Sequence, residues 1–305
     1  MKDFLALLIS AAFMQTAATA DAKLNVVATT PDLAAIAREV GGDVVEITTL
    51  AKPTEDPHFV DAKPSFIVKL NRANALIEGG AELEAGWLQP LLNGSRNPRI
   101  AVGGPGRIVC TQGVALLEVP TTLDRSKGDI HASGNPHYLT DPENAKIVAK
   151  HICEAFCKLD DKLCDQFQAN LQRFSRRFEE RAAEWQRSLA PFAGKSIVSY
   201  HNMWPYFARR FGLKADLFLE PKPGIPPTPA HLAGVIALMK AEQIRVVIVE
   251  PFQNRRTAEK VAAETGAVVV DVTQYPGGIK GTEGGYIELM DYLVRSIATA
   301  LERTK

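Results

Sequence analysis

The sequence contains one unusually long stretch with the pattern of an amphipathic helix. Residues 164–190, CDQFQANLQRFSRRFEERAAEWQRSLA, include no Gly or Pro. Apolar side chains recur at intervals of three or four residues, at Phe167, Leu171, Phe174, Phe178, Ala182 and Trp185. This spacing predicts a helix of about seven turns with one apolar stripe. Such a length is unusual in a globular protein, so the segments on either side decide the fold.

Strand and helix patterns alternate on both sides of the long segment. Before it, apolar β-branched runs predict strands at 23–30, 44–50, 74–80 and 99–104. Helices are predicted between and after them at 31–42, 64–73, 81–94 and 141–159. After it, the patterns predict strands at 195–201, 245–250 and 267–273, and helices at 202–212, 255–266 and 285–305.

This alternation is typical of α/β proteins with mostly parallel sheets. We therefore predict two parallel-sheet lobes, residues 23–160 and 193–305, joined by one long helix within residues 161–192. In parallel α/β sheets, ligands bind beyond the carboxyl ends of the strands. A binding site is accordingly expected in the cleft between the lobes.

Residues 1–22 differ in character from the rest and resemble a secretory signal peptide. Lys2 precedes an apolar run from Phe4 to Met14, and the small residues of ATA at 18–20 suit a cleavage site. The run is too short to cross a bilayer as a helix. No Cys follows it, which argues against lipid attachment. We therefore expect an exported protein.

The charge balance argues against a nucleic-acid partner. Lys and Arg total 35, as do Asp and Glu, and the basic residues form no stripe.

The cysteines favour a disulfide over a metal site. The four, Cys110, Cys153, Cys157 and Cys164, include no C-x2-C pair of the kind that binds zinc. In an exported protein, Cys164 is expected to pair with either Cys157 or Cys153 across the KLDD turn, leaving Cys110 unpaired.

Three of the six histidines lie at predicted loops or strand ends. His58 is in DPHFVDAKPS, His137 is in GNPHYLTDP, and His201 ends the predicted strand KSIVSYH. Asp271 interrupts the apolar run AVVVDVT, where a carboxylate is costly unless it is paired or bound to a cation. Each residue also has an ordinary explanation as a loop residue or a helix cap, and spacing alone does not show that the four converge.

Three segments in the same order, DPHFVDAKPS, GNPHYLTDP and SYHNMWPYFARRFGL, resemble a known family. They are similar to the cluster A-I periplasmic solute-binding proteins that serve ATP-binding cassette (ABC) importers of zinc and manganese. The order of elements and the segment EPFQNRRTAEKVAAETGA fit the same family, and the resemblance runs from about residue 24 to the end.

The resemblance implies that His58, His137, His201 and Asp271 bind a metal, with Glu250 as a rival to Asp271. Three imidazoles and one carboxylate form a tetrahedral site that suits Zn²⁺, whereas Mn²⁺ favours oxygen ligands. Manganese and iron members of the family carry a carboxylate where His201 stands. The implied function is therefore a periplasmic, monomeric, non-enzymatic protein that delivers Zn²⁺ to an ABC permease in the inner membrane.

Alternatives remain at this point. The first alternative function is that of a manganese- or iron-binding importer component of the same family. The second is a zinc hydrolase, although no H-E-x-x-H motif is present. An adhesin-like surface protein is the third.

Zinc-type relatives often carry a long His-rich loop before the second ligand, but the corresponding segment of this chain, TTLDRSKGDIHASG, contains only His131. We expect His131 to be an auxiliary residue or a partner of a ligand.

Overall fold

The computed structural model describes residues 23–122 and 131–304, so the predicted signal peptide lies outside the described residues. The strands are β1 (Leu24–Ala28), β2 (Val45–Thr49), β3 (Ala75–Glu78), β4 (Arg107–Val109), β5 (Ser196–Ser199), β6 (Lys214–Phe218), β7 (Val246–Val249) and β8 (Val268–Asp271). The α-helices are α1 (Pro31–Gly41), α2 (Pro64–Arg72), α3 (Leu88–Ser95), α4 (Pro142–Leu159), α5 (Cys164–Leu189), α6 (Pro205–Phe211), α7 (Pro229–Ala241), α8 (Arg255–Thr265) and α9 (Tyr286–Arg303). Short 3₁₀ helices occupy Gly42–Val44, Tyr138–Thr140, Asp161–Leu163 and Ala190–Phe192.

The strands form two four-stranded parallel sheets of the same topology. Their orders are β2-β1-β3-β4 and β6-β5-β7-β8. In each sheet the strand order reverses between two central strands, β1 and β3 or β5 and β7. Loops that leave the carboxyl ends at such a reversal create a crevice for ligands. The predicted α/β fold with two parallel-sheet lobes is confirmed.

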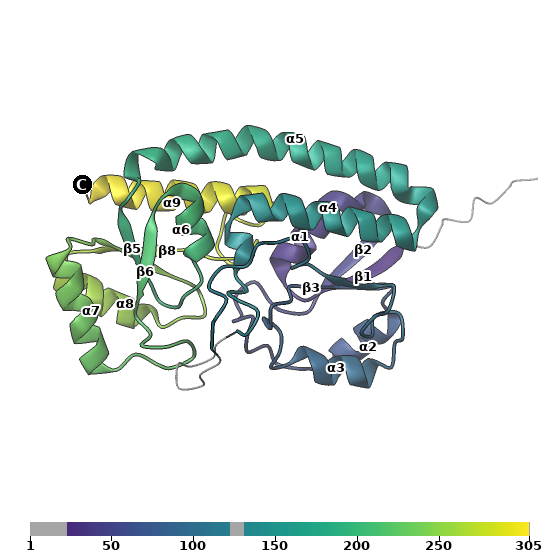
Figure 1. Ribbon diagram of the computed structural model, residues 1–305, viewed down its shortest axis with the longest axis horizontal. Coiled ribbons are helices and arrows are strands. Elements are labelled where there is room, and N and C mark those ends of the chain that lie inside the picture. The colour runs from purple at the N-terminus through teal and green to yellow at the C-terminus, as the bar shows by residue number, and fades with distance from the viewer. Residues whose placement is uncertain (1–22, 123–130, 305) are drawn as a thin grey trace, which may run out of the picture.

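Helix α5 passes over both lobes and joins them (Figure 1). Its buried apolar residues, Phe167, Phe174, Phe178, Trp185 and Leu189, follow the predicted stripe. They belong to one apolar core that includes residues of both sheets and of α1, α4 and α9. The indole Nε1 of Trp185 donates to Asp291 of α9 at 2.6 Å. Because the lobes share this core, their separation at the crevice is fixed by side-chain packing.

Three sequence-based assignments differ from the structure. Residues 99–104 form turns, and the fourth strand begins later, at Arg107. Residues 81–87 precede α3 as turns, with Ala81 and Glu82 at positive φ. Strand β6, with a largely exposed pattern at the edge of its sheet, was not predicted. Its sequence, KADLF, alternates charged and apolar residues and lacks the apolar β-branched run that predicted the other strands.

Among the described helices, none is both long and apolar enough to cross a membrane.

A disulfide joins the end of α4 to the start of α5. It links Cys157 to Cys164, one of the two pairings left open by the sequence, and Cys110 and Cys153 are buried free thiols. The bond crosses seven positions of the chain and closes the turn between the two helices. It therefore fixes the direction in which the long helix starts.

Replacing Cys157 and Cys164 together by Ser is expected to lower the free energy of unfolding by about 2 kcal/mol, because the closed loop is short. Chemical denaturation of the metal-free protein measures this difference. Adding a thiol reductant should bring the wild type to the same midpoint as the variant. Equal midpoints without reductant would show that the disulfide contributes no stability.

Candidate metal site

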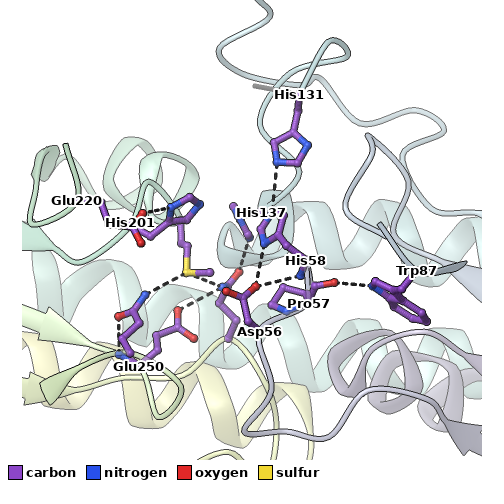
Figure 2. A network of polar contacts seen from close by, with 12 residues as sticks. Asp56, Pro57, His58, Trp87, His131, His137, His201, Glu220 and Glu250 are labelled. Carbon is purple, nitrogen blue, oxygen red and sulfur yellow. Dashed lines mark hydrogen bonds and ion pairs between the residues drawn. The ribbon is translucent and has the colours of Figure 1, made fainter. Parts of the chain in front are cut away.

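His58, His137 and His201 come together in the crevice although they are far apart in the sequence. One ring nitrogen of each lies within 4.8 Å of the others. The ring centroids of His58 and His137 are 5.1 Å apart, and both rings are 5.7 Å from that of His201. Two of the rings come from the N-terminal lobe and one from the C-terminal lobe (Figure 2). The structure thus brings together the three histidines that the sequence singled out.

Each of the three rings has its Nδ1 bonded to an outer acceptor. His58 Nδ1 lies 3.0 Å from Asp56 Oδ1, and His201 Nδ1 lies 2.7 Å from Glu220 Oε2. His137 Nδ1 lies 3.0 Å from Gln274 Oε1. Because these oxygens accept, each Nδ1 carries the hydrogen and each Nε2 keeps a free lone pair. Three Nε2 atoms are therefore the donors available to a ligand in the crevice.

The segments that carry the first two rings are held by buried contacts. His58 follows Pro57, whose carbonyl accepts a bond of 2.8 Å from the indole Nε1 of the buried Trp87. The backbone N–H of His137 donates to Asn135 Oδ1 at 3.0 Å. Both ligand loops are thereby fixed before any ligand arrives.

The His201 segment turns sharply just after β5. The backbone carbonyl of His201 accepts hydrogen bonds from the Ser199 hydroxyl at 2.9 Å and from the Met203 backbone N–H at 2.8 Å. These bonds place the ring at the strand's carboxyl end, opposite His58 and His137.

Burial keeps His137 neutral. Its side chain is 4% exposed, and desolvation lowers the pKa of His137 well below its usual value. Within the described chain, His137 Nε2 has no hydrogen-bond partner. A buried nitrogen without a partner is unfavourable unless a ligand completes it. Neutral imidazole is the form that binds a metal ion.

Glu250, the rival candidate for the fourth ligand, lies behind Gln274. Its Oε1 accepts from Gln274 Nε2 at 3.2 Å, and within the described residues its Oε2 has no partner. Burial raises the pKa of the Glu250 carboxyl to about 8. Gln274 thus connects Glu250 to the Nδ1 side of His137, and burial favours the protonated form of the Glu250 carboxyl group.

Asp271 does not lie with the three histidines. Its side chain is 54% exposed and forms an ion pair with Arg255. Side chains alternate along a strand, and in β8 it is Val270 that is buried. The apolar run around Asp271 suggested a buried carboxylate, but the Asp271 carboxylate is exposed and paired with Arg255. The structure does not support Asp271 as a metal ligand.

Sequence reasoning missed the three Nδ1 acceptors. Asp56 was detectable, since it lies two residues before His58 and accepts from both its backbone N–H and its ring. Glu220 and Gln274 are 19 and 137 residues from their histidines, and no local pattern connects those pairs. Their roles depend on how the loops meet.

The chain was compared with known protein families. A model of the family described as zinc-uptake complex component A, periplasmic (ZnuA), matches residues 26–300. The chain belongs to the ZnuA family. It is accordingly a substrate-binding component of a metal ABC transporter, which works with membrane partners, and it is not an enzyme.

Several relatives of the ZnuA-family chain are named for different metals. The iron-binding protein YfeA of Yersinia pestis is 27% identical, over 90% of this chain and 86% of its own. The metal ABC transporter substrate-binding lipoprotein SloC of Streptococcus mutans is 23% identical, over 93% of this chain and 92% of its own. The manganese ABC transporter substrate-binding lipoprotein PsaA of Streptococcus anginosus is 22% identical, over 97% of this chain and 95% of its own.

Solved structures share the fold. A crystal structure of ZnuA gives a TM-score of 0.78 at 24% identity, covering 92% of this chain and 99% of that one. A manganese-bound periplasmic metal-binding protein from Candidatus Liberibacter asiaticus gives 0.75 at 20% identity, covering 90% and 98%. These likenesses establish the two-lobed architecture with its long helix.

The raised pKa of Glu250 predicts a pH-dependent difference in stability. The folded carboxyl titrates near 8 and the ordinary group near 4.5. Between these values the folded protein holds a proton that the unfolded chain has lost, so the free energy of unfolding falls as pH rises. Glu250→Gln removes this contribution, and the metal-free variant should gain stability relative to the wild type from about pH 5 to pH 8.

Denaturant unfolding in the presence of a chelator measures the difference across this range. Asp271→Asn, which changes an exposed carboxylate, serves as the control and should show no such trend. If the difference in free energy of unfolding between Glu250→Gln and the wild type stayed constant from about pH 5 to pH 8, Glu250 would be ionised across that range.

Proposed function

We propose that the protein binds Zn²⁺ between its lobes and delivers it to an ABC permease in the inner membrane, acting in the periplasm as a monomer. The observation that supports the proposal most strongly is the set of three Nε2 lone pairs facing one another. Their Nδ1 atoms are all engaged outside, so the rings need no rotation to bind an ion. Such a site captures a metal directly from solution.

The donor type favours zinc over manganese. Neutral imidazoles are borderline ligands that suit Zn²⁺, whereas Mn²⁺ and Mg²⁺ prefer oxygen. The two carboxylates that line the cavity with His58 and His201, those of Asp56 and Glu220, are already bonded to ring Nδ1 atoms. Relatives named for iron and manganese show that the family handles several metals, and the nitrogen-rich cluster is the reason for choosing zinc here.

The surrounding charge suits a dication that is carried as cargo. An imidazole binds a metal ion in its neutral form and so brings no charge to the ion. The carboxylates of Asp56 and Glu220 contact the Nδ1 atoms of His58 and His201, so one imidazole ring separates each carboxylate from the ion. Their negative charge is therefore close to the ion, although neither carboxylate coordinates it. Acceptors of this kind orient ligating histidines and increase their basicity.

Metal titration tests the proposal. Zn²⁺ binding to the metal-free protein is expected to be tighter than Mn²⁺ binding. His201→Ala should weaken Zn²⁺ binding by at least about 100-fold, more than loss of an outer hydrogen bond costs. Calorimetry with a competing chelator gives the affinities.

His231→Ala makes the same chemical change outside the cluster, since His231 Nε2 bonds to the Phe218 carbonyl at 3.0 Å. That control should bind Zn²⁺ as the wild type does. The proposal would be contradicted by Mn²⁺ binding as tightly as Zn²⁺, or by unchanged Zn²⁺ affinity in His201→Ala.

A further inference from the structure

A fourth histidine contacts the cluster from the loop above it. His131 Nε2 lies 3.2 Å from His58 Nε2, and the two ring centroids are 5.1 Å apart. Figure 2 shows the His131 ring reaching toward His58 from a separate segment. His131 lines a cavity of about 300 Å³ together with His58 and His201. It also lines a neighbouring cavity with His137.

The direction of the bond between these two nitrogens follows from Asp56. In the neutral form of His58, with its hydrogen on Nδ1 where Asp56 accepts it, Nε2 is an acceptor. His131 Nε2 must therefore carry a hydrogen and donate it. With this hydrogen bond, His131 covers the lone pair with which His58 would bind an ion.

The distance between the two nitrogens suits ligands of one ion. Nitrogens bound to zinc at about 2.0–2.1 Å in a tetrahedron are about 3.3–3.4 Å from each other. The separation of 3.2 Å between His58 and His131 is close to this edge. If the His131 proton moves from Nε2 to Nδ1, both Nε2 atoms present lone pairs to the same point.

The backbone beside His131 is attached to the N-terminal lobe. The Ser133 hydroxyl donates to Glu82 Oε1 at 3.2 Å, and the Ala132 N–H donates to the other oxygen of Glu82. The Gly134 N–H returns to the His131 carbonyl at 3.2 Å. Gly134 has a φ of 111°, and a side chain there would meet the Leu117 carbonyl. This tight turn holds His131 at the mouth of the site.

The carboxylates considered for the fourth position lie outside the group formed by His58, His137 and His201. Asp271 is paired with Arg255, and Glu250 lies behind Gln274 on the Nδ1 side of His137. His131, by contrast, lies directly against a ligand nitrogen.

We propose that His131 is the fourth ligand of the transported metal, completing a site of four imidazoles. The inference rests on the proposed function, namely that His58, His137 and His201 bind Zn²⁺. His131 is outside the set of nitrogens that lie within 4.8 Å of one another, so its ring moves inward when the ion binds. A site of four nitrogens discriminates against Mn²⁺ more strongly than a site of three nitrogens and one oxygen.

X-ray absorption of the zinc-loaded full chain counts the imidazoles around the ion. The wild type should show four and His131→Ala three. His131→Ala should also bind Zn²⁺ at least about tenfold more weakly, with a smaller ratio of Zn²⁺ to Mn²⁺ affinity. His231→Ala is the matched control and should retain four imidazoles and wild-type affinity.

Three imidazoles in the wild type would overturn the role of His131. So would unchanged or tighter Zn²⁺ binding by His131→Ala, the latter showing that His131 competes with the metal for His58. Measuring His201→Ala in parallel separates the two proposals. If only His201→Ala loses affinity, His131 is not a ligand but the zinc site stands; if neither variant does, the zinc site itself is wrong.

Discussion

The metal site depends on three hydrogen bonds that lie outside it. Asp56, Gln274 and Glu220 each accept from the Nδ1 of one histidine, and this fixes both the orientation of the ring and the nitrogen that faces inward. Without these acceptors an imidazole has two tautomers and can rotate, and a cluster of three would have to be ordered by the ion itself. These hydrogen bonds order the three imidazole rings before an ion binds, so less of the binding free energy is lost to arranging the ligands.

One of these hydrogen bonds joins the two lobes. His137 is in the N-terminal lobe, but its acceptor Gln274 follows β8 of the C-terminal sheet. A large relative movement of the lobes would break this bond between buried side chains. Helix α5, packed along α1, α4 and α9, resists such a movement because its apolar stripe is shared by both halves. Capture and release of the metal are therefore expected to involve loops, with His131 at the mouth, more than a hinge between lobes.

Much of this could be predicted from the sequence, and the limits have physical causes. The apolar stripe at 164–190 located α5 to within one residue of its end, since a periodicity of 3.6 over many turns has few alternatives. The histidine motifs identified three converging residues. Asp271 attracted attention through the cost of burying a carboxylate and was assigned as a ligand from the family resemblance, but it is exposed because alternation along β8 turns it to solvent. Gln274 and Glu220 act across long sequence separations, so only the folded structure reveals them.

Anomalous diffraction at the zinc edge, from crystals of the zinc-loaded protein, tests the central claim most directly. We expect one strong peak about 2.0–2.1 Å from Nε2 of His58, His137 and His201. The Nδ1 atoms should still be bonded to Asp56, Gln274 and Glu220. A zinc ion bound through Nδ1 of any of these rings, or located away from the three histidines, would contradict the account.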